Sequence, residues 1–357
     1  MALNLVLSDS LRSAQKVAAH FPDLEDIFRA SSKKLTALGL EKDKAETLTS
    51  PRLIERASRT VAWLAKKGYF ILTVDDPDYP SYLREIFDPP FVLYGAGRPE
   101  VLKEPAVAVV GARRPTPYGK AVAEKLTRDL AASGLVVVSG LARGIDSIAH
   151  WGALDSGRTV AVLGSGLDDV YPPENKGLFR KIAEEGAVVT EFPPDMPPLS
   201  FHFPLRNRII SGLSLATVVI EATRQSGSLI TARLSLEQNR EVMAVPGSLT
   251  SDLSRGTNWL IKSGAKLVET WEDVVEELPS PVRERFLSLR PEEKRMPAMS
   301  PEEKRLFDRL SVDTPVHIDE LVEAADASVS EMLGLLLNLE LKGLIRQMPG
   351  KLFQRSP

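Results

Sequence analysis

Between residues 67 and 276, short apolar runs alternate with segments that have the residue spacing of helices. Most of these runs are continuously apolar, which is typical of strands buried on both faces of a parallel sheet. The intervening helices have the length of right-handed crossover connections. We therefore expect an α/β fold with an extended, doubly wound, Rossmann-like parallel sheet over 67–276. The runs are FILTV, FVLYGAG, VAVVGA, LVVVSG, TVAVLGSG, AVVTEF, ATVVIEA, EVMAVPG and KLVET.

The two ends of the chain differ from this central region. Residues 1–66 have apolar residues at three- and four-residue spacing, which predicts a helical domain. Within it, KLTALGLEKDKAETL is typical of a SAM-like or helix-hairpin-helix domain, and a small bundle that only packs is the alternative. Residues 277–300 contain four prolines and many charges, which predicts a linker. Residues 301–357 have three helical segments and a hairpin, the layout of a winged helix.

Composition excludes several classes of site. The chain has no cysteine, which removes disulfides, thiol catalysis and cysteine metal sites and suits a reducing cytoplasm. Its four histidines have no metal-site spacing. No apolar run approaches the roughly 20 residues of a membrane helix, and the start lacks a signal-peptide pattern. We therefore expect a cytoplasmic protein without a metal site or a membrane segment.

The turn after the run VAVV is cationic. Ligands of open α/β sheets bind at the carboxyl ends of the strands. Between residues 111 and 120 there are three cations and no carboxylate, and Thr116 with Pro117 is typical of a helix N-terminus, which favours anions. The turn therefore suits phosphate, and the alternative is that its arginines are solvated or paired elsewhere. The candidate residues are Gly111, Arg113, Arg114 and Lys120.

Other loops at the same edge of the sheet add small, cationic and aromatic side chains. Small residues after the run LVVV let a ligand approach the backbone closely. A cation three residues before an aromatic suits a single strand, although Phe179 also has the spacing of a helix core residue. An asparagine beside an arginine can contact phosphate, sugar or a base edge. These further candidates are Ser139, Gly140, Lys176, Phe179, Asn207 and Arg208.

The stretch from 226 to 231 predicts an anion cradle, because a Ser-Gly-Ser turn enters a helix there. Its candidate residues are Ser226, Gly227, Ser228 and Thr231. Asp146 and His150 have the spacing for acid–base work, and a cap plus a packed histidine is the alternative. No nucleophile with a base, Walker lysine or Gly-x-Ser-x-Gly elbow is present. We therefore predict a site that binds rather than cleaves, with no catalytic residue and no cofactor.

Six segments occur in order over roughly 105–265: VAVVGARRPTPYG, VVSGLARGIDSIAH, GRTVAVLGSGLDDVYPPENKGLF, FPLRNRIISGLS, VVIEATRQSGSLITARLSLEQNREVMAVPG and GTNWLIKSGA. Together they resemble the DNA-processing protein A family, also called Smf. The resemblance implies a protein that binds single-stranded DNA taken up in natural transformation and helps load the RecA recombinase on it. It also implies a homodimer formed through the Rossmann-like domain. By motif, the DNA pocket would include Arg113, Ser139, Gly140, Lys176 and Phe179, with Asn207 and Arg208 as neighbours.

Two other functions stay open at this point. The sheet also resembles that of nucleotide phosphoribohydrolases related to lysine-decarboxylase-like proteins, which would make Glu221 essential for releasing a base. A protein-only adaptor would leave the cationic turn without a role. The C-terminal domain has seven Lys and Arg against ten Asp and Glu over 301–357. Because of this negative charge, we expect it to contact protein rather than DNA.

Overall fold

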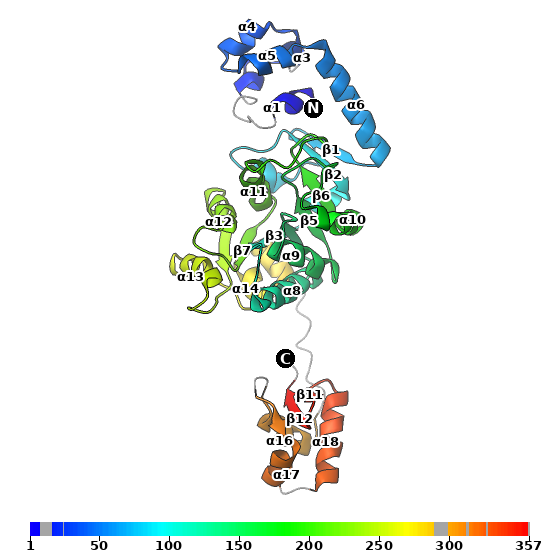
Figure 1. Ribbon diagram of the computed structural model, residues 1–357, viewed down its shortest axis with the longest axis vertical. Helices are drawn as coiled ribbons and strands as arrows, with labels where there is room; N and C mark the ends of the chain where they lie inside the picture. The colour runs from blue at the N-terminus through cyan, green and yellow to red at the C-terminus, as the bar shows by residue number, and fades with distance from the viewer. Residues whose placement is uncertain (8–15, 24, 289–298, 312–313, 326–327, 356–357) are drawn as a thin grey trace. The chain divides into compact units, whose positions relative to one another are not determined.

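The chain forms two compact units, Met1–Leu289 and Arg290–Pro357 (Figure 1). The computed structural model describes residues 1–7, 16–23, 25–288, 299–311, 314–325 and 328–355. The expected α/β fold with helices at the N-terminus and a winged helix at the C-terminus is confirmed.

The first unit is built around a nine-stranded sheet with the order β1-β2-β6-β5-β4-β3-β7-β8-β9. The strands from β6 to β9 in this order pair in parallel, whereas β1 and β2 extend the sheet by antiparallel pairing. The strands are β1 (Phe70–Thr73), β2 (Val92–Gly97), β3 (Ala106–Gly111), β4 (Val136–Ser139), β5 (Thr159–Val162), β6 (Ala187–Thr190), β7 (Ala216–Ile220), β8 (Glu241–Ala244) and β9 (Lys266–Leu267).

Helices cover both faces of this sheet because successive residues of a strand point to opposite sides. Val107 and Val109 of β3 pack in one hydrophobic cluster with α8 and α9, whereas Ala108 and Val110 pack in another with α11 and α12. The continuous apolar runs in the sequence follow from this double burial. The helices are α7 (Ser81–Arg84), α8 (Pro117–Ala132), α9 (Ile145–Leu154), α10 (Lys176–Glu185), α11 (His202–Gly212), α12 (Ser228–Glu237), α13 (Arg255–Lys262) and α14 (Trp271–Glu276).

The order in which the chain adds strands to the sheet reverses at β3. From β3 the chain continues through β4 and β5 to β6 on one side, and it then returns to β7 on the other side of β3. The loops after β3 and β7 therefore diverge, and this divergence opens a crevice at the carboxyl ends of the strands. A ligand site is expected at this switch point.

The N-terminal helices pack on the α/β core within the same unit. Leu64 of α6 shares a hydrophobic cluster with Tyr94 of β2, and the Tyr94 hydroxyl donates to Asn4 Oδ1 at 2.7 Å. A turn joins α4 and α5, and Gly39 adopts φ +97° there, a conformation that favours glycine. The helix-hairpin-helix assignment stays a prediction. The helices are α1 (Ala2–Leu7), α3 (Glu25–Arg29), α4 (Ser32–Ala37), α5 (Lys42–Leu48) and α6 (Pro51–Lys67).

The predicted linker over 277–300 is wrong in its first half. Helix α15 occupies Ser280–Ser288, and Phe286 is buried in the cluster that α8 and α9 share. Its prolines suggested a break, but Pro279 and Pro281 instead lie at the start of a helix, where proline is tolerated. Residues 289–298 of the predicted linker lie outside the described residues.

The second unit is a small winged-helix domain. Helices α16 (Pro301–Arg309), α17 (Ile318–Ala325) and α18 (Val329–Leu341) enclose a core with Leu336 and Phe353. Ser300 and Ser328 cap α16 and α18 in capping boxes with Glu303 and Glu331. An antiparallel sheet completes the unit in the order β10-β12-β11, formed by β10 (Val316–His317), β11 (Ile345–Met348) and β12 (Leu352–Arg355).

Candidate functional site

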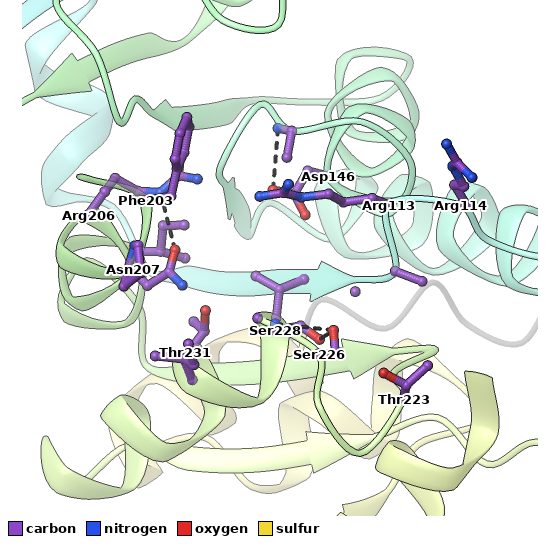
Figure 2. Close-up of a pocket in the computed structure, with 18 of the residues that line it drawn as sticks. Arg113, Arg114, Asp146, Phe203, Arg206, Asn207, Thr223, Ser226, Ser228 and Thr231 are labelled. Carbon is purple, nitrogen blue, oxygen red and sulfur yellow. Dashed lines mark hydrogen bonds between the residues drawn. The ribbon is translucent and has the colours of Figure 1, made fainter. Parts of the chain in front are cut away.

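An open pocket of about 800 Å³ lies at the switch point of the sheet. Its walls come from the loops after β3, β4 and β7, from α11 and from the start of α12 (Figure 2). This volume is in the range that small ligands occupy in proteins. Segments that are distant in sequence thus form one site.

Arg206 on α11 is a buried cation at the floor of the pocket, only 4% exposed. Its Nη1 donates to the Gly140 carbonyl at 2.6 Å and to the Val162 carbonyl. Burial lowers the pKa of Arg206 to about 10, with Asp146 opposing that shift, so the guanidinium stays charged at neutral pH. Arg206 therefore fixes the ends of β4 and β5 to α11.

Asp146 is the carboxylate of the pocket. Its Oδ2 accepts from the Gly140 and Ala142 amides at 3.2 and 3.4 Å, so it stabilises the loop before α9 rather than capping that helix as predicted. Burial raises the pKa of Asp146, and the charge of Arg206 opposes that rise. Figure 2 shows the guanidinium of Arg113 beside this carboxylate. The pocket thus contains more positive than negative charge.

His150 is fully buried and has structural partners. Its Nε2 accepts from the Leu141 amide at 3.3 Å, and its Nδ1 lies 2.6 Å from Thr159 Oγ1, which donates to the Val137 carbonyl. Burial lowers the pKa of His150 to about 3, and Arg206 adds to that shift. Of the two interpretations of Asp146 and His150, the structure favours the structural one.

Asn207 is oriented by its neighbour. Its Oδ1 accepts from Arg206 Nε at 3.3 Å, so its amide nitrogen is the end left for other partners. No hydrogen bond joins this nitrogen to any other residue in the described part of the chain. Asn207 lines the pocket and therefore offers a donor there.

A side chain of the protein occupies the N-terminus of α8, where an open anion site was predicted. Glu221, which follows β7, accepts from the Thr116 amide at 2.8 Å and from the Thr116 hydroxyl. Thr116 in turn caps α8 as expected, because its Oγ1 accepts from the Gly119 amide at 3.1 Å. The anion at this helix end is therefore a carboxylate of the chain itself, which gives Glu221 a structural role.

The structure brings eight of the predicted residues together in the pocket. Arg113 points toward Asp146, whereas Arg114 points outward (Figure 2). A second, shallower pocket of about 550 Å³ is lined by Arg113, Arg114 and Lys120. The eight residues are Gly111, Arg113, Arg114, Asn207, Ser226, Gly227, Ser228 and Thr231.

Three predicted residues have internal partners instead. Ser139 is buried, and its hydroxyl donates to the Val109 carbonyl at 2.7 Å. A Cβ on Gly140 would lie 2.5 Å from the Arg206 guanidinium, so the small residue makes room for a side chain of the protein. Arg208 is buried in ion pairs with Glu191 at 2.6 Å and Asp88 at 3.0 Å, so contact with DNA would first require these pairs to open.

Lys176 and Phe179 lie at the start of α10 and do not line either pocket. Lys176 is exposed, whereas Phe179 is 7% exposed and packs in a hydrophobic cluster with Leu163. Of the two interpretations of Phe179, the structure favours a core residue. Base stacking by Phe179 stays a prediction.

Sequence reasoning missed the aromatic residues that line the pocket. Tyr171 and Phe203 have ring centroids 5.6 Å apart and planes inclined by 53°. Tyr171 is 38% exposed, which leaves part of its ring open to a ligand. Tyr171 follows the carboxyl end of β5, and Phe203 follows that of β6. This position in the sequence could have assigned both residues to the pocket.

The sequence profile of the family described as DNA recombination-mediator protein A matches residues 70–279. The chain belongs to this family. A second profile, the DprA winged helix domain, matches residues 290–351. The switch-point pocket is therefore a feature of the region that defines the family.

Individual relatives agree with this assignment. Protein Smf of Escherichia coli K12 is 39% identical over 300 residues, which cover 82% of this chain and 79% of the relative. DNA processing protein DprA of Bacillus subtilis 168 is 43% identical over 223 residues, covering 62% and 75%. The X-ray structure of DprA from Streptococcus pneumoniae superposes with a TM-score of 0.65 at 37% identity, covering 78% of this chain and 96% of that one.

A further solved structure concerns DNA processing protein A from Helicobacter pylori and its single-stranded DNA binding mode. It has a TM-score of 0.54 and 33% identity, and covers 59% of this chain and 97% of that one. Among the residues described here, no helix is long and apolar enough to cross a membrane. Nor do those residues include a cluster of three side chains suited to a metal ion.

Proposed function

We propose that the family member described here binds single-stranded DNA at the switch-point pocket and along its cationic rim. One observation carries the proposal. Arg114, Lys120 and Lys176 make no ion pair with any residue in the described part of the chain. Arg113 faces Asp146 without forming an ion pair with it. Unpaired cations around a crevice attract the phosphates of a strand.

The pocket also offers contacts suited to unstacked bases. Tyr171 leaves part of its ring exposed, and aromatic faces stack with any base. Asn207 adds an amide donor that can reach phosphate, sugar or a base edge. The DNA processing protein A from Helicobacter pylori, known for its single-stranded DNA binding mode, supports this assignment by its similarity.

We extend the proposal to the partners that the family implies. The protein would hold incoming single-stranded DNA in the cytoplasm, help load RecA on it, act as a homodimer through the α/β domain, and catalyse no reaction. The winged-helix domain would contact protein, because α18 exposes Leu333, Leu337 and Leu341 together with Glu331. A helix that reads a DNA groove would instead present cationic or amide side chains.

Fluorescence anisotropy of labelled oligo-dT, single- and double-stranded, at two salt concentrations tests the DNA proposal. The variants are Arg113→Ala/Arg114→Ala and Lys176→Ala, with Arg233→Ala as the matched control. Arg233 lies on α12 outside both pockets and pairs with Glu237 on the surface. If each rim arginine contacts one phosphate, the double change reduces the salt slope of log K by about 1.4.

We expect single-strand-selective binding that salt and the double change weaken and that Arg233→Ala leaves unchanged. Loss of binding in Lys176→Ala alone would move the strand toward α10. Binding that survives all of these changes would place the site outside the pocket and refute the proposal. An absence of salt-sensitive binding to any oligonucleotide would refute the function itself.

A further inference from the structure

The corner of the pocket at the start of α12 contains hydroxyl groups and no carboxylate. Ser226 Oγ lies 2.8 Å from Ser228 Oγ, and Ser226 Oγ also accepts from the Ser228 amide at 3.3 Å. Gly227 has open space where a Cβ would stand. The helix spans ten residues, so its dipole places partial positive charge at this corner.

Thr231, one turn into α12, provides an independent observation. The residue is only 1% exposed and lines the pocket. Its hydroxyl makes no hydrogen bond to any residue that the structure describes. Figure 2 shows the Thr231 side chain directed toward the pocket, on the side of Asn207. The hydroxyl oxygen is therefore open to the pocket and has no partner in the described part of the chain, so it can exchange a hydrogen bond with a ligand bound there.

The groups around Thr231 select for an anion. The amide nitrogen of Asn207 is a donor because Arg206 occupies the amide oxygen. Arg113 brings a cation to the same pocket. Asp146, the carboxylate among the residues that line the pocket, lies beside Arg113 and accepts from the Gly140 and Ala142 amides. Hydroxyl and amide donors at a helix N-terminus together form a typical phosphate site.

We propose that this corner, which we call the α12 seat and define as Ser226, Ser228, Thr231 and Asn207, binds the phosphate of one nucleotide unit. The inference rests on the proposed DNA-binding function and names what the pocket recognises. The pocket of about 800 Å³ has room for a nucleotide, with Tyr171 available to its base. The rim cations would hold neighbouring phosphates of the same strand.

Calorimetry with deoxythymidine monophosphate and with thymidine tests the seat on the wild-type chain. Thr231→Val is the informative variant, because it keeps the shape of the side chain and removes a hydroxyl without a partner. Its melting temperature should be unchanged or higher. Thr250→Val is the control for the substitution itself, since Thr250 is exposed and lies outside both pockets.

We expect the monophosphate to bind, and thymidine to bind at least about tenfold more weakly. The loss of one hydrogen bond to a charged group raises the Kd by about this factor. Thr231→Val should weaken the monophosphate about tenfold, and Thr250→Val should not. Equal binding of monophosphate and thymidine would overturn the seat, and so would equal binding by Thr231→Val and the wild type. Either of these two refuting results would be compatible with tight binding of oligo-dT. The DNA-binding function is therefore tested separately, by the anisotropy experiment.

Oligo-dT with a 5′-phosphate or a 5′-hydroxyl distinguishes the two sources of the phosphate. Tighter binding of the 5′-phosphorylated strand, lost in Thr231→Val, would assign the seat to the end of a chain. Equal binding of both strands, weakened in Thr231→Val, would assign it to a phosphate within the chain. If Thr231→Val weakens neither strand, the seat is refuted for DNA.

Discussion

Acidification should destabilise the α/β unit through His150. The ring is buried on α9, and the Leu141 amide donates to its Nε2, which fixes the tautomer with the proton on Nδ1. A second proton on Nε2 would face that amide, donor against donor. Burial lowers the pKa of His150 to about 3, and the charge of Arg206 adds to that shift.

The sign and size of the effect follow from the two states. An unfolded histidine gains a proton as the pH falls below about 6.5, whereas the folded one stays neutral until about pH 3. The stability that neutral His150 contributes is therefore complete above pH 6.5 and is lost as the pH falls toward 3. The loss is about 1.4 kcal/mol per pH unit, or about 2 kcal/mol between pH 6.5 and 5.

Urea unfolding followed by tryptophan fluorescence measures this change, because all four tryptophans lie in the first unit. The comparison is between wild type and His150→Gln at pH 7.5 and pH 5. The variant should be less stable than wild type at pH 7.5, and the difference between the two should shrink by about 2 kcal/mol at pH 5. A difference that is the same at both pH values would refute the reasoning.

Three further predictions concern the residues that shape the pocket. Gly140→Ala places a Cβ 2.5 Å from the Arg206 guanidinium and should lower the free energy of unfolding by about 1–3 kcal/mol in urea; an unchanged midpoint would contradict that contact. Arg208→Ala leaves the carboxylate of Glu191 buried without its cation and should cost about 3–5 kcal/mol in the same assay, whereas a loss below about 1 kcal/mol would mean that the pair is open to water. Glu221→Gln should lower stability by about 1–2 kcal/mol through weaker capping of α8 and leave oligo-dT affinity unchanged; reduced affinity would place this residue in the binding site.

The architecture of the first unit could be predicted because its central strands are largely apolar and buried. β3 and β7 are buried on both faces, and this burial is visible in runs such as VAVV. Strand ends of a parallel sheet share one edge, so Gly111, Arg113 and Ser228 could be assigned to one pocket before any contact was known. Local sequence was sufficient for this part of the site.

The predictions for Arg208 and Gly140 differ from the structure because both residues contact segments that are distant in the sequence. In the stretch Arg206-Asn207-Arg208, the two arginines look equivalent, yet both are buried and have different roles. The ion pairs of Arg208 involve residues 17 and 120 positions away, which no local pattern encodes. Gly140 was correctly identified as a point of close approach, but the group that approaches is Arg206 and not an external ligand.

The carboxylate of Glu221 lies at the N-terminus of α8, the first helix after β3. Dinucleotide-binding folds of this type hold a pyrophosphate at the same position. In this protein a carboxylate side chain of the chain itself thus takes the position of that phosphate group. A Cβ on Gly119 would lie 2.3 Å from this carboxylate, so the glycine serves the internal anion. The N-terminus of α8 is therefore held by a carboxylate of the chain, whereas the residues that line the pocket at the N-terminus of α12 include no carboxylate.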